Sequence, residues 1–304
     1  MPRHLSIIFI ILFLSACMGR NDQANQEKYY SNNSTKEFNE YWYSGNAELN
    51  SYELEEARYG EIRKGEAVLI FVTEDFLTEK QVKKESKTEA HHTSVLKLNY
   101  LKKFTTGIYD YSLMSSIFSP VKQDQLTFPI KVSTSSQEWC GHSWMQLNET
   151  AQHYHLQAYS YFEKESDVNR LLNKTLTEDG LWNQIRLNPK LIPQGEVQMI
   201  PSTQYLRLSH NDSKAYLAEI NIIEENDSLQ KQTLKINYPK LSRSVSITFE
   251  KEFTHRILAW TENKMSGGKQ LQTKARLKVS LKNPYWSQNK LSDSTYRKEL
   301  NITH

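Results

Sequence analysis

From Phe38 onward, apolar and polar residues alternate in one segment after another. No segment with the apolar spacing of a helix separates the first six of them. Strands that follow one another without helical crossovers pair antiparallel through short turns. An aromatic content of 11%, beside only 10 glycines in 304 residues, also favours pleated, half-buried surfaces over a glycine-rich cofactor fold. We therefore predict a mainly β protein: an antiparallel meander forming open, curved β-barrel-like halves, with a short helical connector.

The alternation predicts six strands in each half of the folded part. These strands are Ala47–Arg58, Glu66–Glu74, Val95–Phe104, Phe128–Ser135, Glu138–Leu147, His153–Glu163, Thr203–Ser209, Ala215–Glu224, Gln232–Tyr238, Val245–Glu250, Arg256–Glu262 and Ala275–Leu281. Glycine accepts a positive φ at little cost, so turns are expected where it stands between polar residues. The predicted turns are Tyr59-Gly60-Glu61, Lys64-Gly65-Glu66 and Ser266-Gly267-Gly268.

The apolar spacing changes after Glu165 to one that fits the face of a helix. The residues on this face are Val168, Leu171, Leu172 and Leu176, and a second short helix is expected around Leu181, Trp182 and Ile185. The predicted organisation is a signal peptide (1–16), a flexible tether (17–37), an N-terminal β-rich half (38–164), a helical connector (165–201) and a C-terminal β-rich half (202–304).

The N-terminus has the features of a secretory signal: Arg3, then an apolar run over 5–14 that is too short to span a membrane. The run ends in Leu14-Ser15-Ala16-Cys17, which resembles the lipobox of bacterial lipoproteins. This resemblance implies cleavage before Cys17, lipidation of its thiol and anchoring in a membrane through the acyl chains. No aspartate directly follows Cys17, which by analogy with lipoprotein sorting favours the outer membrane and its periplasmic face. An ordinary secretory signal and an uncleaved anchor are the alternatives.

Several function classes are disfavoured by composition and motif content. Lys plus Arg is 38 against 35 for Asp plus Glu. This small surplus of positive charge does not favour binding to the phosphates of a nucleic acid, so we expect no nucleic-acid partner. The chain has no GxSxG elbow, P-loop, GxGxxG, HExxH or paired CxxC motif, and we expect no cofactor. Lipidation of Cys17 would leave Cys140 as the sole thiol, so no intrachain disulfide is expected.

One hairpin gathers the unusual side chains of the chain. These candidates for a ligand site or functional cluster are Trp139, Cys140, His142, Trp144, His153 and His155. A turn over 148–151 would place Trp144 opposite His155 and His142 opposite Gln157, with Cys140, His142, Trp144, His153 and His155 on one face. The opposite face, with Met145, Leu147, Tyr154, Leu156 and Ala158, is then the predicted core face.

This cluster leaves two classes of function open. In the first, the chain is a non-catalytic envelope lipoprotein that binds a lipophilic ligand or an envelope protein, and Cys140 is a buried structural thiol. In the second it is an envelope hydrolase, in which His142, His153 and His155 hold zinc and its activated water. Cys140 would then be an extra ligand or a nucleophile beside His142.

Five segments together are similar to an uncharacterised family of lipoproteins from Bacteroidota. They are Tyr41-Trp42-Tyr43, Tyr59–Ile62, Gly65–Phe76, Ser135–His142 and Arg256–Trp260. Members of that family are often labelled septum formation inhibitor Maf. True Maf proteins are nucleotide pyrophosphatases with a Ser-x-Ser-Pro-Arg-Arg motif, which this chain lacks, so the resemblance implies no such activity and no catalytic residues. The segment Gly65-Glu66-Ala67 also resembles periplasmic proteins with an open, curved β-barrel.

Overall fold

The computed structural model describes residues 34–86, 90–225 and 230–302. The helices are α1 (Lys36–Trp42), α2 (Glu178–Leu187), α3 (Thr203–Ser209) and α4 (Thr295–Glu299). The strands are β1 (Ala47–Arg58), β2 (Glu61–Leu77), β3 (Val82–Lys83), β4 (His92–Thr106), β5 (Tyr109–Pro120), β6 (Lys131–Glu138), β7 (Gly141–Glu149), β8 (His153–Ser160), β9 (Val168–Asn173), β10 (Leu176–Thr177), β11 (Gly195–Ile200), β12 (Tyr216–Glu225), β13 (Lys231–Tyr238), β14 (Arg243–Glu250), β15 (Ile257–Ser266) and β16 (Lys269–Asn283). No helix within the described ranges has the length and apolar character needed to span a membrane.

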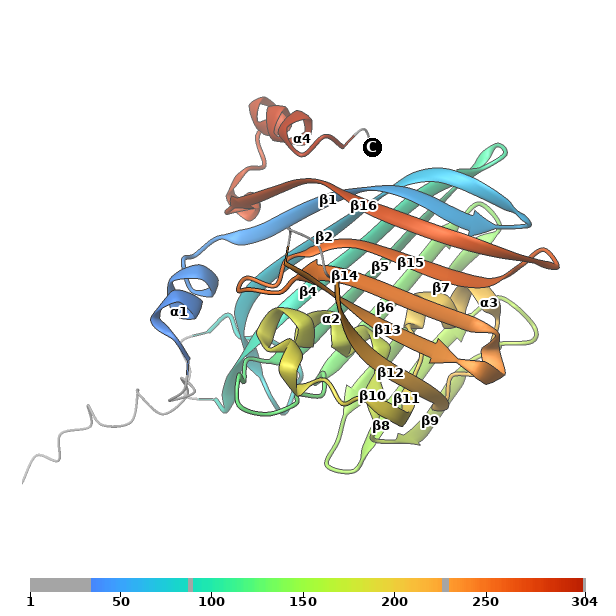
Figure 1. Ribbon diagram of the computed structural model, residues 1–304, viewed down its shortest axis with the longest axis horizontal. Coiled ribbons are helices and arrows are strands. Elements are labelled where there is room, and N and C mark those ends of the chain that lie inside the picture. Colours follow the sequence, from blue (N-terminus) through green and yellow to red (C-terminus); the bar gives the residue numbers. More distant parts are fainter. Residues whose placement is uncertain (1–33, 87–89, 226–229, 303–304) are drawn as a thin grey trace, which may run out of the picture. The chain divides into compact units, whose positions relative to one another are not determined.

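All sixteen strands belong to one sheet (Figure 1). Its order is β10-β11-β12-β13-β14-β15-β16-β1-β2-β4-β5-β6-β7-β8-β9, with β3 added to β2. Neighbours along this order pair antiparallel except β10 and β11, which are parallel. The order ends at β9 and β10, and the sheet does not close into a barrel. The predicted fold class, a mainly β antiparallel meander that stays open, is confirmed.

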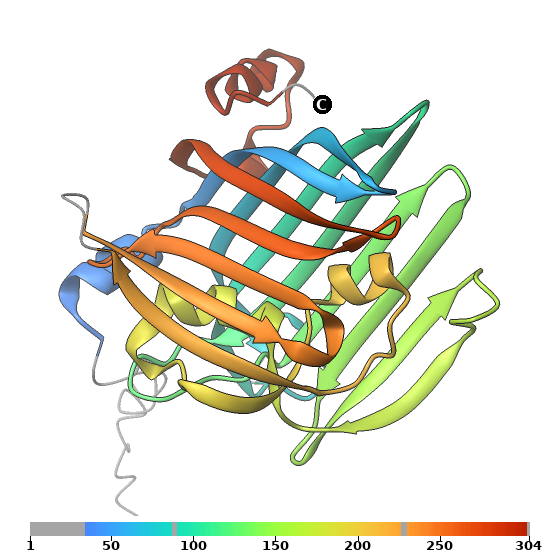
Figure 2. The same cartoon turned by 45° about the vertical axis from the view of Figure 1, so that its right-hand side comes forward.

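The sheet curves around α2 and α3, which lie on its concave, inner face (Figures 1 and 2). Helix α2 starts where the Thr177 side chain accepts a hydrogen bond from the Gly180 N–H, and Pro189 follows its end. All ten residues of α2 are buried. Trp182 packs its ring against Tyr100 of β4 and Trp260 of β15, so the helix contacts strands on both sides of β1 in the sheet order.

A buried ion pair attaches α2 to the first strand. Arg186 donates to both carboxylate oxygens of Glu48, at 2.5 and 2.7 Å, and both side chains are fully buried. Tyr41 and Asn50 donate to the same carboxylate. Burial alone would raise the pKa of Glu48, but the charge and hydrogen bonds of Arg186 outweigh it and hold that pKa at about 2.

A second set of buried charges connects α2 to β14. Three carboxylates and three cations alternate along one row of ion pairs: Lys102, Glu56, Lys264, Glu262, Arg243 and Glu178. Arg243 binds both oxygens of Glu178, at 2.6 and 2.7 Å. Because cations and carboxylates alternate along this row, each buried charge lies next to a partner of opposite sign.

Most of the strand predictions are confirmed, β1 with its predicted bounds. Strands β3, β5 and β11 were not predicted, and one helical and one strand assignment were wrong. Val168–Asn173 is strand β9 and Leu176 begins β10, because this segment pairs with β8 and β11 instead of coiling. Thr203–Ser209, predicted as a strand, is helix α3.

Two of the three predicted turns are confirmed, since Gly60, Gly267 and Gly268 all have positive φ. Gly65 instead lies inside β2, opposite Phe104 of β4. A Cβ at Gly65 would stand 2.3 Å from the backbone oxygen of Lys103. Glycine is therefore needed there for close approach of two strands and not for a bend.

One continuous sheet passes through both of the predicted β-rich halves. Strand β1 of the first half pairs with β16 of the second as well as with β2. The segment 165–201 contributes β9, β10, α2 and β11, so it supplies strands as well as a helix. The proposed signal peptide and most of the tether lie outside the described residues.

We expect Arg186→Met to destabilise the protein by about 3–5 kcal/mol, because it leaves the Glu48 carboxylate buried without its partner. Glu48→Gln/Arg186→Met should recover most of that loss in urea unfolding monitored by circular dichroism. The Glu48 pKa is lowered in the folded state, so its contribution to stability exists above its ordinary pKa and is lost as the pH falls toward 2. The double variant should lack that part of the acid transition. A single variant as stable as the parent protein would contradict this account.

Candidate functional site

The β7–β8 hairpin holds most of the residues predicted as a site, but its strands pair in a different register. Trp144 lies opposite Tyr159, not His155, and Asn148 lies opposite His155. Thr150 N–H donates to the His153 carbonyl, so the turn is two residues later than predicted. The predicted register was therefore wrong by four positions.

The predicted core face of this hairpin is nevertheless correct in its centre. Leu147, Tyr154 and Leu156 are buried, and Met145 packs against the core. A shift by an even number of residues leaves each side chain on the same face of a strand. The error in register therefore moved residues along the sheet without exchanging its two faces.

The new register separates the three histidines proposed as zinc ligands. His142 pairs with Gln137, whereas His155 is opposite Asn148, six residues farther along β7. At roughly 3.3 Å per residue this is about 20 Å along the strand. His155 instead has its Nε2 atom 2.6 Å from Oδ1 of Asn169 on β9. In the described part of the chain, no three His, Cys, Asp or Glu residues are placed to hold a metal ion.

Trp139 and Cys140 form the tip of the β6–β7 turn, and both are exposed. The prediction of a buried structural thiol was therefore wrong. The negative charge of Glu138 raises the pKa of the Cys140 thiol. A nucleophilic cysteine needs a lowered pKa, so this surrounding works against thiolate chemistry.

Trp144 borders a cleft of about 160 Å³ between β7–β8 and α3. Its indole N–H donates to the Ser133 hydroxyl at 3.1 Å, and its ring stacks on Tyr159. Within the cleft, Arg207 donates to Ser143 and lies 3.6 Å from Glu165. These polar groups pair with one another, so the cleft is mainly a region of ion pairs that hold α3 to the sheet.

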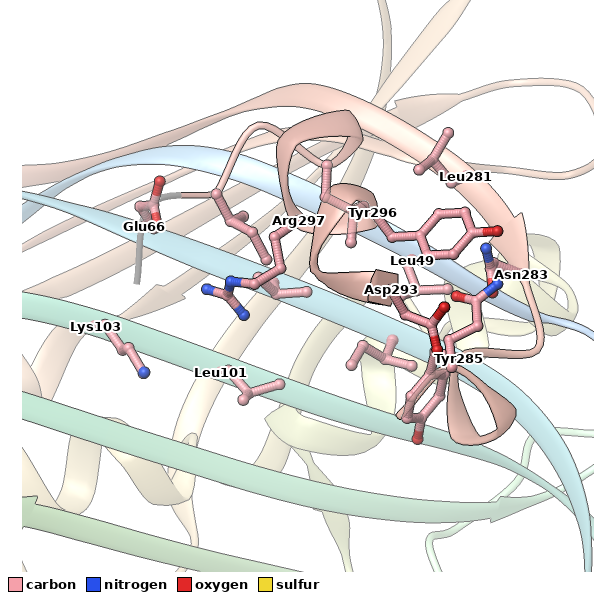
Figure 3. Close-up of a pocket in the computed structure, with 15 residues that line it drawn as sticks. Leu49, Glu66, Leu101, Lys103, Leu281, Asn283, Tyr285, Asp293, Tyr296 and Arg297 are labelled. Carbon is pink, nitrogen blue, oxygen red and sulfur yellow. The ribbon is translucent and has the colours of Figure 1, made fainter. Parts of the chain in front are cut away.

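A different pocket, which we call the C-terminal pocket, lies between the outer face of the sheet and the segment after β16 (Figure 3). Its volume is about 320 Å³. The residues that line it are Leu49, Glu66, Val68, Ile70, Leu101, Lys103, Leu281, Asn283, Tyr285, Gln288, Asp293, Tyr296, Arg297, Leu300 and Ile302. They come from β1, β2, β4 and β16 below and from the chain after β16 above.

The chain after β16 turns back over the sheet because Pro284 cannot continue the strand pairing. It passes through two short 3-10 turns into α4 and ends on Leu300, which is buried with Ala47, Leu49 and Val72 in a small second core. The Ser51 hydroxyl donates to the Leu300 carbonyl at 2.5 Å. These contacts hold the chain after β16 against β1 and β2, where it covers the pocket.

The C-terminal pocket is apolar in its middle and polar at both ends. Figure 3 shows Arg297, Lys103 and Glu66 at one end, and Asn283, Tyr285 and Asp293 at the other. Glu66 is paired with Lys278 at 3.1 Å. Glu66 and Lys103 also line a larger open groove of about 1020 Å³ that continues over β2, β4 and β5. A ligand with an apolar chain and a polar end group would match this distribution of apolar and polar side chains.

The sequence contains a signal for this pocket that the alternation pattern alone does not reveal. Residues 67–72 read Ala-Val-Leu-Ile-Phe-Val, an unbroken apolar run within β2. Ala67, Leu69 and Phe71 are fully buried on the inner face, which leaves Val68 and Ile70 on the outer face. A strand that is apolar on both faces indicates that something covers each face.

We expect the Cys140 thiol to be alkylated slowly at neutral pH despite its exposure, because Glu138 raises its pKa. Glu138→Gln should accelerate alkylation by iodoacetamide at pH 8 by a few-fold, since more of the thiol is then ionised. Glu163→Gln, a charge change in the next turn along this edge, is the control and should have little effect. Equal rates in the parent protein and in Glu138→Gln would show that Glu138 does not control the thiol.

Comparison with protein-family models, curated proteins and solved structures found no match to this chain. The similarity to Bacteroidota lipoproteins therefore stays a prediction. Function has to be inferred from the geometry of the chain itself, above all from the C-terminal pocket.

Proposed function

We propose that this chain is a non-catalytic, lipid-anchored protein of the bacterial envelope that holds a lipophilic ligand in the C-terminal pocket. The observation that carries the proposal is the apolar middle of that pocket, formed by Leu49, Val68, Ile70, Leu101 and Leu281. Its volume of about 320 Å³ lies within the range of small-molecule sites. Each methylene buried there contributes roughly 0.8 kcal/mol to binding.

The two ends of the pocket suggest what kind of lipophilic ligand it takes. Lys103 and Arg297 are the cations at one end, and this end adjoins the open groove. A ligand with a single apolar chain would place the chain beneath Tyr296 and Leu300 and its polar or anionic head beside these cations. The groove leaves space for a head group larger than the pocket itself.

The proposed anchor depends on sequence alone, since Cys17 lies outside the described residues. It is consistent with a lipophilic ligand, because a protein anchored to a membrane meets such ligands at high local concentration. The alternative of a zinc- or thiol-dependent hydrolase lacks comparable support. Its histidines are separated by the observed register, and its cysteine has a raised pKa.

The ligand itself is tested by native mass spectrometry of the protein after gentle extraction from its membrane. We expect an additional mass that is released by an organic solvent and that belongs to a lipid-like molecule. Repeated recovery of the protein without such a mass would count against the proposal.

The pocket is tested with a fluorescent analogue of dodecanoic acid. Leu101→Glu places a carboxylate in the apolar wall and should weaken binding of the probe more than tenfold, or about 1.4 kcal/mol. Leu171→Glu, an equivalent change at an exposed position on β9, is the matched control and should bind as the parent protein does. Loss of binding in both variants, or in neither, would contradict binding of the probe in the C-terminal pocket.

The anchor is tested by mass spectrometry of the mature N-terminus. We expect the mature chain to begin at Cys17 and to carry a diacylglyceryl group on its thiol, and we expect Cys17→Ser to retain the signal peptide. An unmodified terminus at another residue would contradict the lipoprotein assignment while leaving the pocket proposal intact.

A further inference from the structure

Five turns at one end of the sheet each present a large apolar side chain to solvent. The antiparallel order brings the β1–β2, β4–β5, β6–β7, β8–β9 and β15–β16 connections to the same end (Figure 2). We call the exposed apolar residues in or beside these turns the apolar rim: Tyr59, Ile108, Trp139 and Tyr161 in the turns and Met265 near the end of β15, which are 50%, 81%, 70%, 49% and 53% exposed. Turns ordinarily carry Gly, Asn, Asp or Ser, so exposed apolar residues in or beside five successive turns need an explanation.

The rim is held in place by contacts between neighbouring turns. The Tyr161 ring lies over Gly141, where a Cβ would stand 2.3 Å from it. Tyr59 shares a 2.7 Å hydrogen bond with Tyr111, and the Gly60 turn packs against Gly267. These contacts orient the Tyr161 and Tyr59 side chains without burying them and hold the β1–β2 and β15–β16 turns together.

We propose that the apolar rim inserts into the surface of a lipid bilayer. Hairpins that follow one another in a sheet are about 10 Å apart, so the rim is one line of side chains and not the broad patch that a protein interface requires. Trp and Tyr are the residues that favour the interface between membrane and water. This inference does not depend on a ligand in the C-terminal pocket.

The charges beside the rim favour a zwitterionic lipid surface. Arg63 pairs with Glu61 at 2.5 Å, and the Glu138 carboxylate lies 3.7 Å from Arg207. The β8–β9 turn adds the exposed side chains of Glu163, Lys164 and Asp167, so the charges beside the rim are of both signs. Electrostatic attraction to lipid then contributes little, and the apolar side chains must supply the affinity. Binding should therefore be insensitive to salt.

The tether is long enough for the rim to reach the membrane that holds the anchor. Helix α1 leads into the end of β1 opposite the rim, and β1 is 12 residues long, about 40 Å. The chain from Cys17 to Lys36 can span up to roughly 65 Å when extended. An anchor on Cys17 would thus permit the rim to lie on the same bilayer.

The test measures how close the rim comes to lipid in the full chain bound to phosphatidylcholine vesicles. A fluorophore is attached to Cys140, and single labelling is verified by mass spectrometry. Quenchers are carried on the lipid head groups. The matched control is Cys140→Ser/Trp286→Cys, because Trp286 is exposed, as Cys140 is, but follows the end of β16 that lies opposite the rim.

We expect quenching at Cys140 to be several-fold stronger than at position 286. Ile108→Ser/Trp139→Ser should reduce it to the level of that control, whereas Leu101→Glu should leave it unchanged, which separates the rim from the pocket. High salt or added phosphatidylglycerol should have little effect. Equal quenching at the two positions, or quenching that high salt abolishes, would overturn the proposal. The same holds if the rim variant is quenched as strongly as the parent protein.

Discussion

The structure depends on the pairing of charged side chains on α2 with charged side chains on the sheet. Helix α2 carries three buried ionisable side chains, of which Asp179 accepts hydrogen bonds from Thr203, while Glu178 and Arg186 need charged partners on the sheet because an isolated buried charge is very costly. Arg243 of β14 and Glu48 of β1 supply these partners with two hydrogen bonds each. Since β15 and β16 lie between these two strands in the sheet, the same pairs hold α2 against strands that are not neighbours.

Much of the sheet could be predicted from alternation, and its exceptions have physical causes. In β5 the inner positions include Ser115 and Ser119, which are buried because they bond to Thr134 and Asn183. Polar residues at buried positions hide the alternation that identifies a strand. For α3, the residues from Thr203 onward alternate as a strand would, but the helix fills the inner face, where no further strand can pair.

The candidate site was harder to predict than the fold, because it depends on register and on contacts between distant segments. Alternation fixed the two faces of the β7–β8 hairpin, yet it could not decide where the turn between Glu149 and Tyr154 lies. The C-terminal pocket needs β2 and Leu300 to come together, a contact that no local pattern encodes. The apolar run over residues 67–72 indicated a covered outer face without showing what covers it.

The pairing of the first long strand with the last sets the order in which the protein can be completed. Ala47 lies opposite Asn283, so this ladder joins residues that are more than two hundred positions apart. Contacts of such high sequence separation form late and slowly. During synthesis, β1 and β2 can pair as soon as both are available, but the other edge of β1 stays unpaired until β16 has been made. The C-terminal pocket is built on that last pairing and on the residues after β16, so it can form only when nearly the whole chain has been made.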